Sequence, residues 1–215
     1  PTSTEANEML INGQRWTRDV NQHEIVYSVS RSQTTKPGAL IDRGANGGVA
    51  GADVGIIRKL HRTVDVQGID NHQIVDIPIV VAGAVINTQR GPAIAIMNQY
   101  AYVEKGKTIH SSGQLEWHGQ DVNERSVKVK NGEQRILTLE GYAIPINIRN
   151  GLPYITMRPY TDKEWDDLPH VFFTSDSEWD PCILDHDLDD DQQWFDALTD
   201  LPEGMLDPLF DEYGG

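Results

Sequence analysis

The chain reads ALIDRGANGGVAG over residues 39–51, an apolar run that ends in a carboxylate and continues into a glycine-rich segment. A β-strand that ends at Ile41 would present Asp42 at its tip. Gly44, Gly47 and the glycines that follow would give the backbone freedom and let it approach that carboxylate closely. The stretch therefore predicts a strand and turn that display one acidic side chain.

Charge divides the chain into a nearly neutral body and an acidic tail. Residues 161–215 carry 18 Asp and Glu against one base, Lys163, whereas residues 1–160 carry 15 acids and 17 bases. A break of this kind predicts a domain boundary near residue 160. We expect a flexible N-terminal segment over residues 1–22, a folded domain over 23–160 and an acidic extension or linker over 161–215.

Composition also disfavours several classes of protein. The chain has no clustered basic stretch of the kind that nucleic-acid binding needs. Its single cysteine, Cys182, cannot form an internal disulfide, and no apolar run approaches the 18 residues of a membrane span. We therefore expect a soluble cytoplasmic protein that binds neither membrane nor nucleic acid directly.

Short segments rich in β-branched and aromatic residues recur along the body, with turn signals between them. The expected strands cover residues 24–29, 39–42, 63–66, 74–86, 93–103, 126–129, 134–139, 142–148 and 154–157. Many short strands at this spacing are typical of an all-β barrel or sandwich.

Helices are expected mainly in the tail. Thr161 followed by Glu164 forms a capping-box pattern for a short helix that Pro169 would end. Residues 189–200 are a second candidate, and residues 53–60 could form a helical turn or two. Three of the five tryptophans lie in the tail, which predicts that it packs on the body or on a partner.

Several stretches after Asp42 follow an order that resembles a known family. Residues 63–73 predict a hairpin with a polar tip, apolar strands follow, and the series ends on Ser-Ser-Gly-Gln-Leu at residues 111–115. This order resembles the protease of copia-type LTR retrotransposons, including the copia-like elements of diatoms. In that family an Asp motif precedes a flap hairpin, and the domain closes on Ser-x-x-Gln-Leu. The resemblance covers residues from about 25 to about 210.

The resemblance implies a retropepsin-like closed barrel with a flap hairpin. It implies an aspartic endopeptidase that needs no metal or cofactor and cleaves its own Gag-Pol polyprotein in a virus-like particle. The residues that it assigns are Asp42 for catalysis, Arg43, Gly44, Ala45 and Asn46 for the substrate-binding loop, and Gly68, Ile69, Asp70, Asn71 and His72 for the flap.

This chemistry needs two carboxylates that share a proton, one acting as base toward water and the other donating to the scissile carbonyl. The motif around Asp42 is not repeated at Asp65, Asp70, Asp76 or Asp121, because none of these is followed by glycine two residues later. The active form is therefore expected to be a homodimer in which Asp42 of each copy faces the other across a two-fold axis.

Arg43 departs from the family, which has Ser or Thr at this position. A guanidinium cannot accept a hydrogen bond, and a cation beside Asp42 would favour the ionised carboxylate and move activity toward acidic pH. Two interpretations are open. Either Arg43 points outward into a different network, or the site is impaired and the chain is a non-catalytic dimerisation module with an acidic partner-binding tail.

Other reactive residues have simpler interpretations. His72 and His110 lack metal-ligand spacing and are expected to be a loop residue and a packed residue. The acidic run at 185–191 lacks the glycine and the bidentate glutamate of a calcium loop. Cys182 has no base near it in the sequence and is not expected to be a nucleophile.

Overall fold

The computed structural model describes residues 8–11, 14–17, 38–68 and 73–184. The chain divides into two compact units, residues 1–34 and 35–215. In the first unit, β1 (Glu8–Ile11) pairs antiparallel with β2 (Gln14–Thr17). The strand expected at 24–29 and the helix expected at 189–200 lie outside the described residues.

The second unit consists mostly of β-structure, as the sequence predicted. Its strands are β3 (Ala39–Asp42), β4 (Val49–Ala50), β5 (Gly55–Gln67), β6 (Gln73–Thr88), β7 (Gly91–Tyr102), β8 (Ile109–Ser111), β9 (Asp121–Asn123), β10 (Arg135–Leu137), β11 (Ala143–Pro145), β12 (Asn147–Arg149), β13 (Leu152–Ile155), β14 (Met157–Arg158) and β15 (His170–Phe172). Its helices are α1 (Ser112–Trp117), α2 (Asp162–Asp167) and the 3-10 turn η1 (Pro181–Leu184).

Ten of these strands form one sheet. Its main path runs β12-β13-β3-β8-β4-β7-β6-β14, while β5 pairs with β6 and β15 pairs with β7. The strands β11-β10-β9 form a separate three-stranded sheet. The path begins at β12 and ends at β14 without joining them, so the described strands do not form the closed barrel that was expected.

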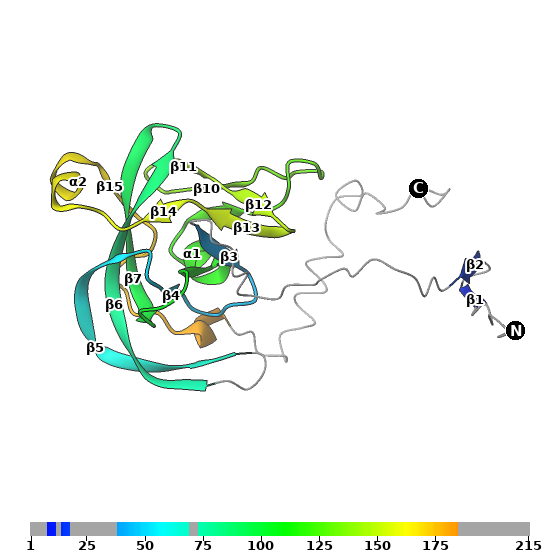
Figure 1. Cartoon of the computed structure of the whole chain (residues 1–215), viewed down its shortest axis with the longest axis horizontal. Helices are drawn as coiled ribbons and strands as arrows, with labels where there is room; N and C mark the ends of the chain where they lie inside the picture. Colours follow the sequence, from blue (N-terminus) through cyan, green and yellow to red (C-terminus); the bar gives the residue numbers. More distant parts are fainter. Residues whose placement is uncertain (1–7, 12–13, 18–37, 69–72, 185–215) are drawn as a thin grey trace, which may run out of the picture. The chain divides into compact units, whose positions relative to one another are not determined.

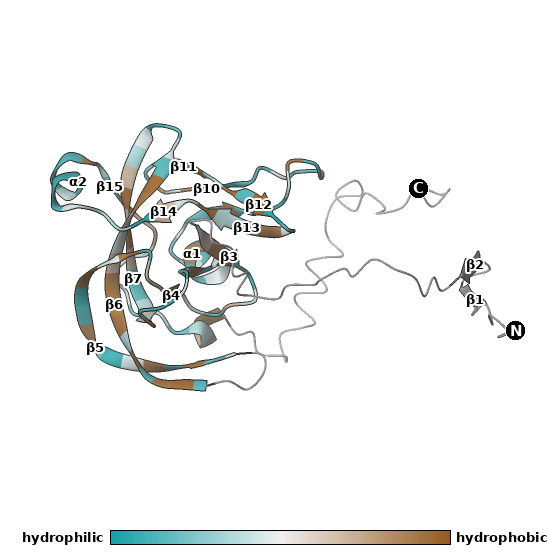
Figure 2. Ribbon diagram, viewed as in Figure 1, coloured by the Kyte–Doolittle hydropathy of each residue, from teal (hydrophilic) through white to brown (hydrophobic). Residues whose placement is uncertain are grey.

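A long hairpin of β5 and β6 dominates one side of the unit and curves along it (Figure 1). Its register shifts at three places along β5, and such bulges bend a strand pair and increase its twist. The central stretch of β6 from Ile79 to Ile86 is buried on both faces and is brown in Figure 2, whereas α2 is mainly teal. The hairpin is thus rooted in the core and exposed toward its tip.

The two faces of β6 and β7 cover two hydrophobic clusters. Val80, Ala82 and Ala84 face the main cluster, which also contains Ile41 of β3. On the opposite face, a smaller cluster of Val81, Val85, Ile94 and Ile96 packs against Leu60, Tyr160, Trp165 and Leu168. Strand alternation thus places side chains from the acidic tail against the sheet.

The boundary expected near residue 160 does not separate compact units, because the chain beyond it continues the fold. β15 pairs in parallel with β7, and Val171 and Phe173 are fully buried in the main cluster. The capping box at Thr161 is confirmed: Thr161 Oγ1 accepts from the Glu164 amide at 3.3 Å, and the Glu164 carboxylate accepts from the Thr161 amide at 3.0 Å. The boundary was expected from net charge alone, which does not register the apolar residues Val171 and Phe173.

Local expectations failed at three other places. The helical turn expected over residues 53–60 does not form, because residues 55–60 are the start of β5, and α1 was not expected. Residues 126–129 form a turn, in which the Val127 amide donates to the Gln134 side chain at 2.9 Å.

Among the described residues, no helix combines the length and the apolar character needed to cross a membrane.

Candidate active site

Asp42 ends a short strand that is held on both sides. β3 pairs in parallel with β8, which sets Asp42 opposite Ser111, and antiparallel with β13. Ala39, Leu40 and Ile41 are buried, whereas Asp42 is half-buried. The sheet therefore carries a buried strand that ends in one accessible carboxylate, as the sequence predicted.

The turn after β3 fixes one oxygen of that carboxylate. The amide of Gly44 donates to Oδ1 of Asp42 at 2.8 Å, and the amide of Ala45 donates to the Asp42 carbonyl at 3.3 Å. A Cβ on residue 44 would lie 3.2 Å from the same Oδ1. Glycine therefore allows the backbone to approach the carboxylate that it binds.

Gln114 anchors the other end of the glycine-rich loop. Its Oε1 accepts from the buried amide of Gly48 at 2.8 Å, and its Nε2 donates to the carbonyl of Gln99 at 3.3 Å. Its own amide donates to Oγ of Ser111, which caps α1. The Ser-x-x-Gln motif thus begins the helix and ties the loop to β7.

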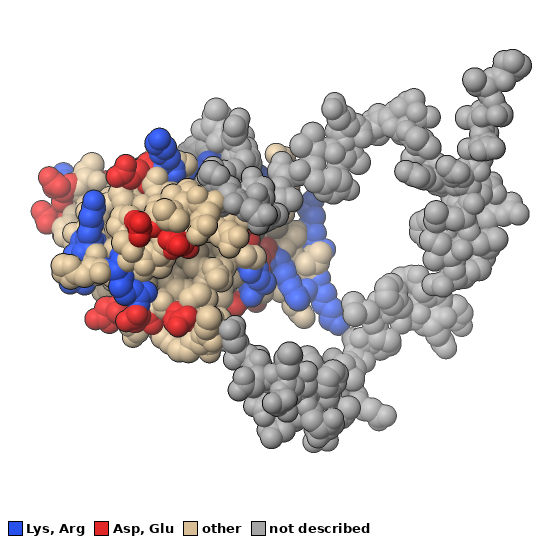
Figure 3. Space-filling view, turned by 90° about the horizontal axis from the view of Figure 1, so that it is seen from below, with Lys and Arg blue, Asp and Glu red and all other residues tan. Residues whose placement is uncertain are grey.

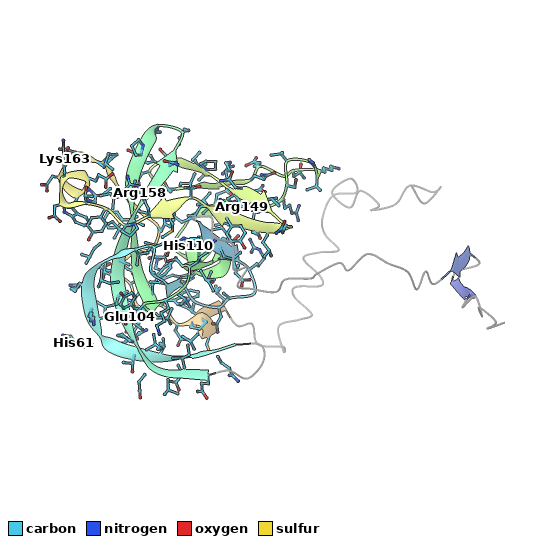
Figure 4. The ribbon with its side chains drawn as sticks, in the orientation of Figure 1. His61, Glu104, His110, Arg149, Arg158 and Lys163 are labelled. Carbon is cyan, nitrogen blue, oxygen red and sulfur yellow. The ribbon has the colours of Figure 1, made fainter. Side chains whose placement is uncertain are left out.

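A buried aromatic pair lies beneath this junction. The Tyr100 hydroxyl and Nδ1 of His110 are 2.9 Å apart, and His110 also meets Phe173 edge to face. Figure 4 shows His110 at the centre of the unit beside β3, whereas His61 lies at the outer edge of β5. Burial lowers the pKa of His110 to about 3 and raises the pKa of Tyr100. His110 is therefore the packed residue that the sequence predicted.

Arg43 is bound by two carboxylates from elsewhere in the chain. Its Nη1 and Nη2 donate to Glu116 of α1 at 3.0 and 2.8 Å. Its Nε and Nη2 donate to Glu124 at 2.7 and 3.1 Å. These hydrogen bonds, that of Glu116 first, raise the pKa of Arg43 above its ordinary value. Arg43 thus connects the Asp42 loop to α1 and to the segment after β9.

Of the two interpretations of Arg43, the structure contains the outward network. Glu116 and Glu124 together carry more negative charge than the one guanidinium that joins them, so the cation is compensated locally. The expected shift of activity to acidic pH assumed an uncompensated cation beside Asp42, and that assumption does not hold.

A hollow of about 330 Å³ lies beside the loop. It is lined by Arg43, Ala45, Asn46, Ser111, Gly113, Glu116, Trp179, Pro181 and Leu184. Three of the predicted loop residues are thus brought together there with α1 and with the tail. A larger hollow of about 580 Å³, lined in part by Ile57, Trp165 and His170, contains none of the predicted site residues.

The predicted flap corresponds to the β5–β6 hairpin. Gly68 follows β5 directly, whereas Ile69, Asp70, Asn71 and His72 lie outside the described residues. The hairpin is thus described up to its turn.

No family model, no curated protein and no solved structure matches this chain. What the protein does is therefore inferred from the geometry of the Asp42 loop and from the order of motifs in the sequence.

A second Asp-x-Gly was overlooked by the sequence reasoning, at Asp53-Val54-Gly55. Asp53 does not end a buried strand. Its Oδ1 accepts from the amide and the hydroxyl of Thr108 at 3.0 and 2.6 Å, and it lies just before β5. Asp53 thus fixes the segment that leads into β8. Asp42 differs from Asp53 because it ends the buried strand β3 and accepts a hydrogen bond from the Gly44 amide of the following turn.

A metal site or a charged binding surface would each require a cluster of suitable side chains among the described residues. No group of three or more His, Cys, Asp or Glu residues within the described ranges could hold a metal ion. Figure 3 shows acidic and basic side chains of the described residues interspersed on one face of the unit.

Sequence reasoning missed the partners of the loop. Ser111 and Gln114 were noted only as a family marker, although their spacing is an N-cap pattern. Glu116 and Glu124 lie in no recognisable motif, so no sequence signal pointed to them as partners of Arg43. The tail was expected to pack on the body or on a partner, and Trp179 packs directly on the loop.

Proposed function

We propose that this chain is the aspartic endopeptidase of a copia-type retrotransposon, which cleaves the Gag-Pol polyprotein that contains it within a cytoplasmic virus-like particle. One observation carries the proposal: Asp42 is half-buried at the end of a buried strand, with the Gly44 amide on its Oδ1. A carboxylate held in this way has a fixed position from which to exchange protons. The copia-like order of motifs supports the same function.

The proposed active form is a homodimer, because one such carboxylate is half of the required pair. Asp42 and the partner subunit's Asp42 share one proton across the two-fold axis. The ionised member takes a proton from a water molecule, which attacks the scissile carbonyl carbon, while the protonated member donates to the carbonyl oxygen. The carboxyl that took the water proton then donates it to the leaving nitrogen, and the other carboxylate takes a hydroxyl proton from the tetrahedral intermediate. The C–N bond breaks, and the pair again holds one shared proton.

The β5–β6 hairpin is the proposed flap over the peptide-binding site. It is rooted in the core through Val80 and Ala82 and carries Gly68 at its exposed end. A hairpin of this kind can move as a unit over a bound peptide and exclude water during the reaction.

Arg43 has a proposed positioning role. In the related family a hydroxyl at this position bonds across the dimer and stiffens the pair of loops. Here the guanidinium binds Glu116 and Glu124 of its own chain, so each loop is fixed from within its subunit. This replacement supports an intact site, because the loop still has an anchor.

The same residue favours a second candidate function. If the missing hydroxyl is essential, the chain is a non-catalytic dimerisation module with an acidic tail for partner binding. The two candidates differ in what Asp42 does, because only a protease needs its ionisable group.

The experiment is to express a polyprotein fragment with the parent chain or with Asp42→Asn and to follow its processing. Asparagine keeps the shape of the side chain, and its Oδ1 can still accept the hydrogen bond from the Gly44 amide. It cannot act as an acid or a base, because it has no carboxyl group. We expect processing to fall by at least about a thousandfold, the scale set by loss of an essential acid or base.

Asp162→Asn is the matched control, because Asp162 is an exposed acid in the first turn of α2. It should process the fragment at the parent rate. Equal processing by the Asp42→Asn variant would refute the protease and leave the interaction module as the better account.

A further inference from the structure

Residues 175–184, here called the plug segment, lie between the β5–β6 hairpin and the Asp42 loop and contact both. Nη2 of Arg62 in β5 donates to the Trp179 carbonyl at 3.3 Å, and the Arg62 guanidinium pairs with the Glu178 carboxylate. On the other side, Nε1 of Trp179 donates to the carbonyl of Asn46 at 2.9 Å. Figure 1 shows the orange turn η1 on the concave side of the curved hairpin.

Trp179 is the anchor of the plug segment. Only 6% of its surface is exposed, and its ring lies 5.5 Å from that of Trp117 and 6.4 Å from that of His118. The segment is also fixed at its start, where the Ser175 amide donates to Nδ1 of His118 at 3.1 Å. These contacts bury an aromatic side chain from the acidic tail against the loop and against α1.

The plug segment also lines the hollow beside the loop. Pro181 and Leu184 of η1 form one wall of it, and Arg43, Ala45 and Asn46 form another. The Asn46 carbonyl, two residues after Gly44, is a main-chain acceptor of the kind that binds an incoming peptide. In this structure the Asn46 carbonyl already accepts a hydrogen bond from Nε1 of Trp179.

We propose that the plug segment occupies the peptide-binding site of its own chain and has to leave before a polyprotein segment binds. This inference rests on the proposed function. The contacts also define a substrate class, peptides in which an acidic residue precedes an aromatic one. Arg62 donates to the carboxylate of the acid. The Asn46 carbonyl accepts from the indole Nε1, and the rings of Trp117 and His118 pack against the aromatic side chain.

The contacts of the plug segment differ in strength. The Glu178 side chain is 71% exposed, and ion pairs at exposed sites contribute little because water screens them. Trp179 is buried and carries most of the attraction, since aromatic burial dominates such interfaces. Removing this one side chain should therefore open the site.

The test uses the full chain with Trp179→Ala and two measurements. The first is hydrogen exchange of the backbone amides of residues 44–48, and the second is cleavage of a synthetic peptide that contains a Glu-Trp pair. We expect faster exchange and a rise of about tenfold or more in kcat/KM, through a lower KM, because a site that is mostly covered binds in proportion to its open fraction.

Trp165→Ala is the matched control. Trp165 is also a tail tryptophan that packs on the sheet, but it lies in the opposite cluster with Val81 and Val85. Its removal should lower stability without changing exchange at residues 44–48 or kcat/KM. A general loosening of the fold would affect both variants alike.

The outcomes separate this inference from the proposed function. Two results would refute the covering of the site by the plug segment without refuting the protease. One is unchanged amide exchange at residues 44–48 in the Trp179→Ala variant, and the other is peptide cleavage with the same kcat/KM in that variant and the parent chain. Faster exchange without cleavage of the Glu-Trp peptide by any variant would support the covering of the loop and refute the inferred substrate class, whereas the protease itself is refuted by the Asp42→Asn processing experiment.

Discussion

The backbone amide of Gly48 donates to Oε1 of Gln114 at 2.8 Å, although 66 residues separate them in the chain. The contact is buried, and it joins the loop after Asp42 to the helix that follows β8. Two stretches that the sequence offered as separate motifs are therefore one structural unit, and the position of Asp42 depends on both.

Gln114→Ala removes the acceptor and leaves a buried amide without its partner. We expect the free energy of unfolding to fall by about 1–3 kcal/mol, with a further loss from the small cavity, and peptide cleavage to fall with it. Urea unfolding measures the first effect. Gln89→Ala is the control, because Gln89 also bonds main-chain groups but is exposed, so water can replace it. Equal losses in the two variants would contradict the buried anchor.

Adjacent glycines in the loop should respond very differently to a methyl group. A Cβ on residue 48 would lie 2.4 Å from the Tyr100 ring, which is fully buried, whereas a Cβ on residue 47 would meet its nearest neighbour, Trp179, at 3.7 Å. We expect Gly48→Ala to cost about 3 kcal/mol or more through overpacking, and Gly47→Ala less than about 0.5 kcal/mol. Thermal unfolding of both variants checks this. Similar midpoints would show that Gly48 is not packed against the Tyr100 ring as described.

The burial of His110 makes the protein less stable in acid. Because its pKa is lowered to about 3 in the fold, against about 6.5 when unfolded, the unfolded chain binds the extra proton between these values. Stability should therefore fall as pH drops below 6.5, by about 1.5 kcal/mol from this residue between pH 6.5 and 5. Burial of His118 acts in the same direction.

Urea unfolding at a series of pH values tests this dependence. His110→Gln keeps an acceptor for the Tyr100 hydroxyl but cannot titrate, so its stability should vary less with pH. His61→Gln, at an exposed position of β5, should keep the slope of the parent chain. A parent slope that survives in His110→Gln would assign the effect to other groups.

Strand positions could be read from the sequence where burial on a sheet left a simple pattern. The apolar run before Asp42 and the long apolar stretch around Ile79–Ile86 became β3 and β6. The capping box at Thr161 also formed, because its two hydrogen bonds are local. Each of these signals lies within a few residues of the feature that it specifies.

Other features depend on contacts between distant residues and could not be read locally. β15 forms because Val171 and Phe173 enter the core beside β7, although the surrounding charge suggested a linker. Residues 55–60, which were expected to be helical, became the start of β5 because β6 pairs with them. The ion pairs of Arg43 span 73 and 81 residues, so no short motif announces them.

Arg43→Thr introduces a hydroxyl, as in the family that the sequence resembles, and removes the hydrogen bonds to Glu116 and Glu124. We expect lower kcat/KM from a looser loop, with a stability loss of only about 0–1 kcal/mol because the ion pairs are exposed. The acid limb of the pH-rate profile should stay in place, because the two glutamates already compensate the guanidinium. An upward shift of that limb would mean that the cation acts on the Asp42 carboxylates.

The central claim is that Asp42 acts in a pair formed by two copies of the chain, and subunit mixing tests it most directly. A fixed amount of the parent chain is mixed with an equal amount of the Asp42→Asn chain, allowed to exchange subunits, and assayed for peptide cleavage. If both carboxylates are required, random pairing leaves about half of the original activity, because half of the parent chains sit in inactive mixed dimers. Activity that stays unchanged after mixing, with sedimentation showing only monomers, would contradict the account.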